Sequence, residues 1–235
     1  GIPGAEDLAP ANRADNNINH PATNILFLEN THNCTRGIAV SPERFAETAR
    51  EGHRLGFHVH LDGARIFNAS VYYGVDVKVF TDEVDSVQFC LSKGLGAPMG
   101  SMLCGSHEFI ERARKARKRI GGGQRQVGIA AAAGLYALKN NIPRLSEDHC
   151  NAGLLCELLK KGGVNVEEVP NMTNMIFFPM LEGYPSDDNF VSACKERGLL
   201  LNALSPRRIR LVTHLDVNRE DVERAASIIL EVISQ

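Results

Sequence analysis

The chain has 235 residues, enough for one or two domains with substantial hydrophobic cores. Its 26 Lys and Arg residues nearly balance 28 Asp and Glu residues, which leaves a formal net charge of −2. This balance argues against nucleic acid or an acidic membrane as the main partner, because both attract a strong basic excess. Since 43% of the residues are hydrophobic and 23% are charged, the composition is that of a folded globular chain and excludes disorder.

Two further patterns bear on the compartment. The longest apolar run, residues 127–138, is far shorter than the roughly 20 residues that a membrane-spanning helix needs. The six cysteines are scattered and form no CxxC pair, which fits reduced thiols better than a disulfide framework or a zinc site. We therefore expect a cytoplasmic protein without a membrane anchor or a bound metal.

In the first half of the chain, predicted strands alternate with predicted helices. The apolar runs 25–28, 57–61 and 86–91 predict strands, and residues 42–54 and 66–73 predict the helices between them. Ser41 followed by Pro42 is typical of a helix start, and Gly56 of a helix end. This order indicates a parallel sheet flanked by helices, in which ligands bind beyond the carboxyl ends of the strands. The polar loops 29–33, 62–65 and 92–96 follow the three strands, so we expect them to converge on one edge of the sheet.

The predicted elements of the second half follow in order. They are a short returning strand at 100–104, a charged helix at 107–119, an Ala-rich helix at 126–139 that we expect to be buried, and a helix at 145–161. Beyond residue 171, strands at 175–180 and 209–212 with helices near 188–197 and 218–234 form a second, βαβ-like block. We predict an α/β protein with a large domain, residues 1–145, and a small C-terminal α/β domain, residues 146–235.

Lys93 is the first candidate for covalent chemistry. It lies between the predicted strand 86–91 and the glycine-rich loop 94–98, where the backbone can approach a ligand closely. A lysine on a rim of low dielectric would favour its uncharged, nucleophilic form and could form a Schiff base. The competing interpretation is a solvated loop lysine, which the apolar and glycine-rich flanks argue against.

Asp62 and Arg65 follow the predicted strand 57–61. A carboxylate at a strand's carboxyl end could hold a charged ring nitrogen, as pyridoxal phosphate requires, or could simply begin a turn. Arg65 could grip a substrate carboxylate in a bidentate manner, or could be a surface arginine at a helix start. The residue pattern alone leaves both pairs of alternatives open.

Other basic residues are also candidates. Arg125 follows three glycines, a flexible presentation that suits anion binding or reaching into a neighbouring subunit, or a plain hinge. Arg210 alternates with apolar residues, so its side chain should point away from the buried face, toward either solvent or a substrate carboxylate. The basic run 112–119 is typical of a solvated helix face, because no aromatic residues interleave with it.

Several blocks together resemble the L-threonine aldolase family. They are 28–33 (LENTHN), 60–65 (HLDGAR), 90–98 (CLSKGLGAP), 121–126 (GGGQRQ) and 210–217 (RLVTHLDV). The blocks occur in the family's order and the likeness covers nearly the whole chain from Ile25. The resemblance implies a fold-type-I, aspartate aminotransferase-like enzyme. Such an enzyme uses pyridoxal phosphate to cleave β-hydroxy amino acids to glycine and an aldehyde, in threonine catabolism and glycine biosynthesis.

The same resemblance implies a role for each matching residue. Lys93 would bind pyridoxal phosphate covalently, and Asp62 would pair with its ring nitrogen. Arg65 and Arg210 would bind the substrate carboxylate, while Arg125 would reach the cofactor phosphate across a subunit interface in a homodimer or homotetramer. The family also carries an active-site histidine near His20, although here the spacing to Glu29 is one residue short.

One departure from the family pattern precedes Ile25, where this chain offers no Gly/Thr loop to cradle a phosphate. We therefore expect the chain alone to bind the cofactor poorly, and we weigh two alternatives to a threonine aldolase. One is a truncated, non-catalytic subunit of the family, and the other is a fold-type-I β-eliminating lyase. Retention of Lys93, Asp62, Arg65 and Arg210 argues against the non-catalytic subunit.

Overall fold

A computed structural model describes residues 2–13, 18–180, 186–204 and 207–234. The chain divides into two compact units. The first comprises residues 1–33 and 39–143, and the second comprises residues 34–38 and 144–235. The second unit is therefore discontinuous in sequence, which the sequence pattern did not indicate. The assignment of a cofactor-binding domain to 1–145 and a small domain to 146–235 stays a prediction.

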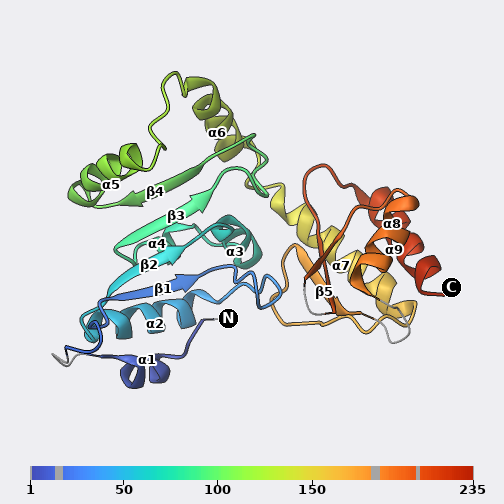
Figure 1. The fold of residues 1–235 in the computed structure, drawn as a ribbon, viewed down its shortest axis with the longest axis horizontal. Helices are drawn as coiled ribbons and strands as arrows, with labels where there is room; N and C mark the ends of the chain where they lie inside the picture. Colours follow the sequence, from blue (N-terminus) through green and yellow to red (C-terminus); the bar gives the residue numbers. More distant parts are fainter. Residues whose placement is uncertain (1, 14–17, 181–185, 205–206, 235) are drawn as a thin grey trace. The chain divides into compact units, whose positions relative to one another are not determined.

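A four-stranded sheet forms the centre of the first unit (Figure 1). Its strands lie in chain order: β1 (Ile25–Glu29), β2 (His58–Asp62), β3 (Ser86–Cys90) and β4 (Ser101–Gly105). The first three strands are parallel, and β4 returns antiparallel to β3. The predicted mostly parallel sheet is thus confirmed, with strand bounds within one residue of those expected.

The helices among the described residues of this unit are α1 (Ala5–Ala11), α2 (Pro42–Arg54), α3 (Ile66–Tyr73), α4 (Lys78–Thr81), α5 (His107–Arg119) and α6 (Gly128–Asn140). Local sequence explains the ends of α2. The Ser41 hydroxyl accepts a hydrogen bond from the backbone N–H of Arg44, and Pro42 occupies the first turn. Gly56, with φ of +84°, lets the chain leave the helix.

The two faces of the sheet differ in their surroundings. Alternate residues such as Leu26, Leu28, Val59, Leu61 and Val87 are buried in one core with apolar residues of α2, α3 and α4, among them Phe45, Ile66 and Phe80. Their neighbours in the strands point to the opposite face, where Phe27 is 66% exposed. Asp62 and Gln88 lie on this more open face because they alternate with Leu61 and Val87.

The Ala-rich helix α6 is not buried, so that expectation was wrong. Only Gly134 and Ala137 are buried, whereas Ile129 is 88% exposed and Leu135 and Tyr136 are also exposed. Gly134 packs so closely on Leu91 that a Cβ atom there would lie 2.9 Å from a Leu91 methyl group. The helix is apolar on all sides, but the rest of this unit covers only one narrow stripe of it. An apolar composition alone does not distinguish a fully buried helix from one that is covered along a single stripe.

The second unit has a three-stranded sheet of order β5-β7-β6, built from β5 (Met175–Pro179), β6 (Asn202–Leu204) and β7 (Arg208–Val212). Helices α7 (Leu145–Lys161), α8 (Asp187–Glu196) and α9 (Arg219–Ile233) complete it (Figure 1). Both β5 and β6 are antiparallel to β7, so they run parallel to each other and α8 connects them. This is the predicted βαβ block, although its second strand is β6 and not the expected 209–212.

Residues 34–38 are tied to this second unit by two polar contacts. The Thr173 hydroxyl donates to the Gly37 carbonyl at 2.7 Å, and Arg36 Nε lies 2.6 Å from Glu167 Oε2. Throughout the parts of the chain that the structure describes, no helix combines the length and the apolar character needed to cross a membrane.

Candidate active site

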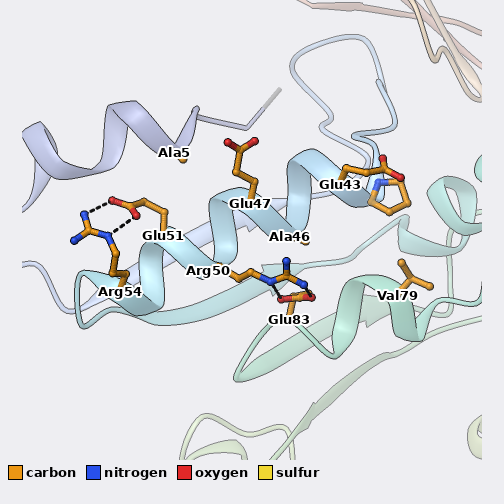
Figure 2. Close-up of a pocket in the computed structure, with 10 residues that line it drawn as sticks. Ala5, Glu43, Ala46, Glu47, Arg50, Glu51, Arg54, Val79 and Glu83 are labelled. Carbon is orange, nitrogen blue, oxygen red and sulfur yellow. Dashed lines mark hydrogen bonds and ion pairs between the residues drawn. The ribbon is translucent and has the colours of Figure 1, made fainter.

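One surface hollow, beside α2, does not contain the predicted site residues. It has a volume of about 690 Å³ and lies along the outer side of α2 (Figure 2). Its charged groups include two ion pairs, Arg54 with Glu51 and Arg50 with Glu83. These pairs are largely solvated, so the hollow is best described as a charged helix surface.

The carboxyl ends of the parallel strands bring together most of the predicted residues of the first unit. Glu29 and Asp62 end β1 and β2 as direct neighbours in register, and Gln88 lies beside Asp62 on β3. Lys93 follows β3 in the next loop. Because parallel strands end at the same edge of a sheet, these polar residues lie together at the carboxyl edge, as predicted.

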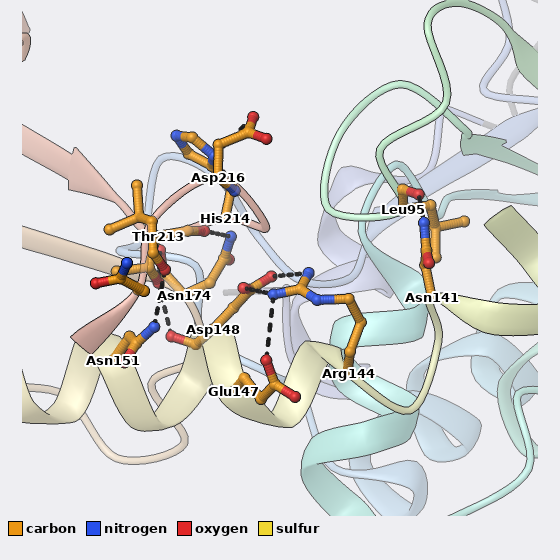
Figure 3. A network of polar contacts seen from close by, with 12 residues as sticks. Leu95, Asn141, Arg144, Glu147, Asp148, Asn151, Asn174, Thr213, His214 and Asp216 are labelled. Atoms are coloured by element: carbon orange, nitrogen blue, oxygen red, sulfur yellow. Dashed lines mark hydrogen bonds and ion pairs between the residues drawn. The ribbon is translucent and has the colours of Figure 1, made fainter. Parts of the chain in front are cut away.

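The loop that carries Lys93 is anchored by its apolar neighbours. Leu91, Leu95 and Ala97 are at least 94% buried, and the Ala97 N–H donates to the Leu91 carbonyl at 2.9 Å. The Asn141 side chain also donates to the Leu95 carbonyl at 2.7 Å (Figure 3). Lys93 itself is exposed, so the expected low-dielectric surroundings are not found among the described residues. The buried flanks fix the loop and turn the polar residues between them outward.

Asp62 is held through one of its two carboxylate oxygens. Oδ1 accepts from the backbone N–H of Ala64 at 3.0 Å and from the side-chain amide of Gln88. Within the described residues, Oδ2 accepts no hydrogen bond. The carboxylate can therefore receive one further donor from the open face of the sheet. Sequence reasoning missed Gln88, because only the register of β2 and β3 reveals its position.

Arg65 lies at the start of α3 and is half-buried. Its Nη1 is 3.4 Å from Asn33 Oδ1, so it meets the loop that follows β1. Glu29 organises that loop: Oε1 accepts from the Asn33 N–H at 3.1 Å, and Oε2 lies 3.5 Å from His32 Nε2. The structure thus brings Arg65 and the predicted 29–33 loop together at the carboxyl edge.

His60 occupies the same sheet face, two residues before Asp62. Its Nδ1 is 2.8 Å from the Ser86 hydroxyl, and its ring centroid is 4.9 Å from that of Phe27. Partial burial lowers the pKa of His60, against an opposing effect of Asp62. The neutral imidazole is therefore favoured near neutral pH, and sequence pattern gave no reason to single it out.

Two predicted residues of the first unit lie elsewhere. Arg125 is exposed in the segment between α5 and α6, and within the described residues no carboxylate pairs with it. His20 lies in the segment that enters the amino end of β1, so the structure does not place it with the residues at the carboxyl edge.

Arg210 belongs to the second unit, on β7 between the buried residues Ile209 and Leu211. The prediction that its side chain points away from the core is confirmed by this alternation. Arg210 lines a cavity of about 260 Å³ together with Asn202 and His214. Most of the lining is apolar, including Leu199, Leu201 and Val217, so the Arg210 guanidinium is one of the few polar groups there and can bind an anion.

A buried polar network supports the 210–217 block (Figure 3). The Thr213 hydroxyl donates to the Asp148 carbonyl at 2.6 Å, and Thr213 and Asn174 are joined by backbone and side-chain hydrogen bonds. Asp148 is fully buried and paired with Arg144 at 2.6 Å. Burial raises the pKa of Asp148, and the Arg144 guanidinium opposes that rise. The network joins α7 to the ends of β5 and β7, close in sequence to Arg210.

No group of three or more His, Cys, Asp or Glu side chains suited to a metal ion occurs among the residues with a described position. Comparison with known proteins shows similarity to threonine aldolases. The low-specificity L-threonine aldolase of Escherichia coli K12 is 46% identical over 211 residues, which cover 89% of this chain and 60% of that protein. The chain thus spans less than two thirds of the length of such curated relatives.

Solved structures share the fold at low sequence identity. A threonine aldolase from Leishmania major matches with a TM-score of 0.76 and 14% identity over 99% of this chain and 68% of its own. A structure of SPT with a PLP internal aldimine matches with a TM-score of 0.72 and 19% identity over 97% of this chain and 58% of its own. The predicted fold-type-I α/β architecture is therefore confirmed. Since the model of the beta-eliminating lyase family matches residues 1–181, the chain belongs to that family.

Proposed function

We propose that this chain carries out the reaction of its threonine aldolase relatives, the cleavage of L-threonine or L-allo-threonine to glycine and acetaldehyde. The observation that carries the proposal is the position of Asp62 at the carboxyl end of β2 together with that of Lys93 in the loop after the neighbouring parallel strand β3. Asp62 Oδ2 accepts no hydrogen bond from the described residues, and the Lys93 amine is exposed. A carboxylate and an amine so placed suit a cofactor with a basic ring nitrogen and an aldehyde.

The donor set fits pyridoxal phosphate, the cofactor implied by the fold type. When bound, pyridoxal phosphate withdraws electrons from the substrate's Cα and so stabilises the charge left as the Cα–Cβ bond breaks. The Lys93 amine would hold it covalently, and Asp62 Oδ2 would accept the ring N–H. An ionised Asp62 keeps that nitrogen protonated, which is the electrostatic contribution of this chain to the reaction.

The remaining residues have binding roles in this proposal. Arg65 and Arg210 would bind the substrate carboxylate, for which a planar guanidinium offers two parallel donors. Arg125 would reach the phosphate of a neighbouring subunit's cofactor in a homodimer or homotetramer, and its exposure supports such a role. His20 remains a candidate only because it lies near the position of the family's active-site histidine, although its spacing to Glu29 is one residue short. We further place the protein in the cytoplasm, in amino-acid metabolism, with free thiols at all six cysteines.

The family description itself favours keeping the second reaction, β-elimination, as an alternative. Product analysis separates the two. The aldolase gives acetaldehyde and glycine from threonine, whereas the lyase gives pyruvate and ammonia from cysteine or tryptophan. The non-catalytic subunit is the less favoured alternative, because the structure keeps Asp62, Arg65 and Lys93 at one edge of the sheet.

The experiment that tests the proposal combines a visible absorbance titration with pyridoxal phosphate and an assay of threonine cleavage. The unaltered chain should release acetaldehyde and develop a visible band that saturates only at high cofactor concentration, as the expected weak binding of this chain requires. Lys93→Ala should lose both, while Lys139→Ala, an exposed lysine on α6, should keep both. A band of equal intensity in Lys93→Ala would refute the covalent role of Lys93, and pyruvate without acetaldehyde would replace the aldolase by the lyase.

A further inference from the structure

Gln88 makes the contact at the carboxyl edge that neither the sequence nor the family pattern predicted. Its side-chain amide donates to Asp62 Oδ1, the oxygen that also accepts from the Ala64 N–H at 3.0 Å. Asp62 and Gln88 are partners in the register of β2 and β3, so their side chains share one face of the sheet. Because two donors bind Oδ1, they fix the orientation of the Asp62 carboxylate group.

A backbone contact from Gln88 holds the same turn. The Gly63 N–H donates to the Gln88 carbonyl at 2.8 Å. A Cβ atom on residue 63 would lie 2.9 Å from that carbonyl oxygen, so only glycine permits this approach without a shift. Gln88 therefore binds the 62–64 turn through both its backbone and its side chain, and the orientation of Asp62 is determined by β3 as well as by its own strand.

We propose that Gln88 is a positioning residue that holds Oδ1 of Asp62 and thereby presents Oδ2 to a ring nitrogen donor. The identity of that donor as the ring of pyridoxal phosphate rests on the proposed function, whereas the hold on Oδ1 does not. An amide suits this task because it donates to the carboxylate without neutralising it. A lysine or arginine at residue 88 would compete for the negative charge that the ring nitrogen requires.

The first test is the dissociation constant of pyridoxal phosphate for Gln88→Leu, measured by absorbance titration of the whole chain. Loss of a hydrogen bond to a charged group should weaken binding by about tenfold. Ser86→Ala is the matched control, since Ser86 lies two residues away on the same strand face and contacts His60 instead of Asp62. The control should bind within about twofold of the unaltered chain, because it leaves both donors on Oδ1 in place.

Gln88→Glu adds a second, opposite prediction. A carboxylate against Oδ1 places two like charges together, so this variant should bind more weakly than Gln88→Leu and should recover as the pH falls. If Gln88→Leu binds as tightly as the unaltered chain, or Gln88→Glu binds as tightly as Gln88→Leu, the positioning role is overturned.

A second readout needs no cofactor. In ¹H–¹⁵N spectra of the cofactor-free chain, the side-chain amide signals that Gln88→Leu removes should shift in Asp62→Ala and stay in place in Ser86→Ala. Signals unmoved by Asp62→Ala would overturn the inference even if the chain binds pyridoxal phosphate. If the unaltered chain binds no pyridoxal phosphate, the proposed function fails, and the amide result alone then decides whether Gln88 holds Asp62.

Discussion

Replacing Arg144 by methionine tests the buried polar network of Asp148, Asn174 and Thr213 at the end of β7, the strand that carries Arg210. Arg144 makes two contacts with Asp148, at 2.6 and 3.3 Å, and the Asp148 side chain is 0% exposed while that of Arg144 is 20% exposed. Two unit charges about 4 Å apart attract by about 4 kcal/mol at an effective dielectric constant of about 20. Arg144→Met should therefore lower the free energy of unfolding by about 3 kcal/mol at pH 7.5, in line with the roughly 3–5 kcal/mol typical of broken buried pairs.

The loss should depend on pH in a definite direction. Burial raises the pKa of Asp148, so its folded form binds a proton more tightly than its unfolded form. Stability therefore falls as the pH rises from the ordinary carboxyl pKa through the raised folded value. Without Arg144 that pKa rises further and protonation relieves the unpaired charge in acid. The difference between variant and unaltered chain should thus shrink as the pH falls from 7.5 toward 5.

Urea unfolding followed by far-ultraviolet circular dichroism at the two pH values measures this effect. Glu147→Gln is the matched control, since Glu147 is 72% exposed and 3.9 Å from the same guanidinium. The control should cost less than about 0.5 kcal/mol at either pH. A loss in Arg144→Met no larger than that of the control, or a loss independent of pH, would refute the conclusion that the buried carboxylate depends on Arg144.

Three further substitutions have defined outcomes. Gly63→Ala should lower the free energy of unfolding by about 1–3 kcal/mol, because the added Cβ atom would crowd the backbone carbonyl of Gln88. Thermal denaturation measures this loss, and an unchanged melting temperature would contradict the prediction. Although burial opposes it, a 2.7 Å hydrogen bond from the Val59 N–H holds the pKa of Asp85 below its ordinary value. This contribution is lost as the pH falls through the lowered pKa, so in urea unfolding the destabilisation by Asp85→Asn should be full at pH 7 and should decrease as the pH falls below about 4. On the proposed function, Arg210→Lys should raise the KM for threonine about tenfold with a smaller change in kcat, and an unchanged KM would contradict the proposed role of Arg210 in carboxylate binding.

The open face of the sheet gives the site its character. Phe27, His60, Asp62 and Gln88 all project from it, and Phe27 is exposed beside the polar residues. An aromatic ring can pack against such a surface while its nitrogen meets a carboxylate at the edge. The face therefore combines apolar contact with the oriented Asp62 carboxylate, which is what the proposed cofactor requires.

Features encoded by neighbouring residues could be predicted from the sequence. Ser41-Pro42 and Gly56 set the ends of α2, because capping and glycine conformations involve only a few consecutive residues. Apolar runs predicted β1 to β3 within a residue, and polar loops after each strand located the carboxyl edge. The motifs around Asp62 and Lys93 indicated the resemblance to threonine aldolases, which the 46% identity to such a relative and the beta-eliminating lyase family match bear out.

Contacts between residues far apart in sequence were decided only by the tertiary structure. The hydrogen bond between Asp62 and Gln88 joins residues 26 positions apart in sequence and depends on the register of β2 and β3. The attachment of residues 34–38 to the second unit depends on contacts with Thr173 and Glu167. The exposure of α6 and of Lys93 likewise depends on what packs against them. Periodicity reports which side of an element is apolar, but burial is a property of its neighbours, and these are fixed only when the whole chain has folded.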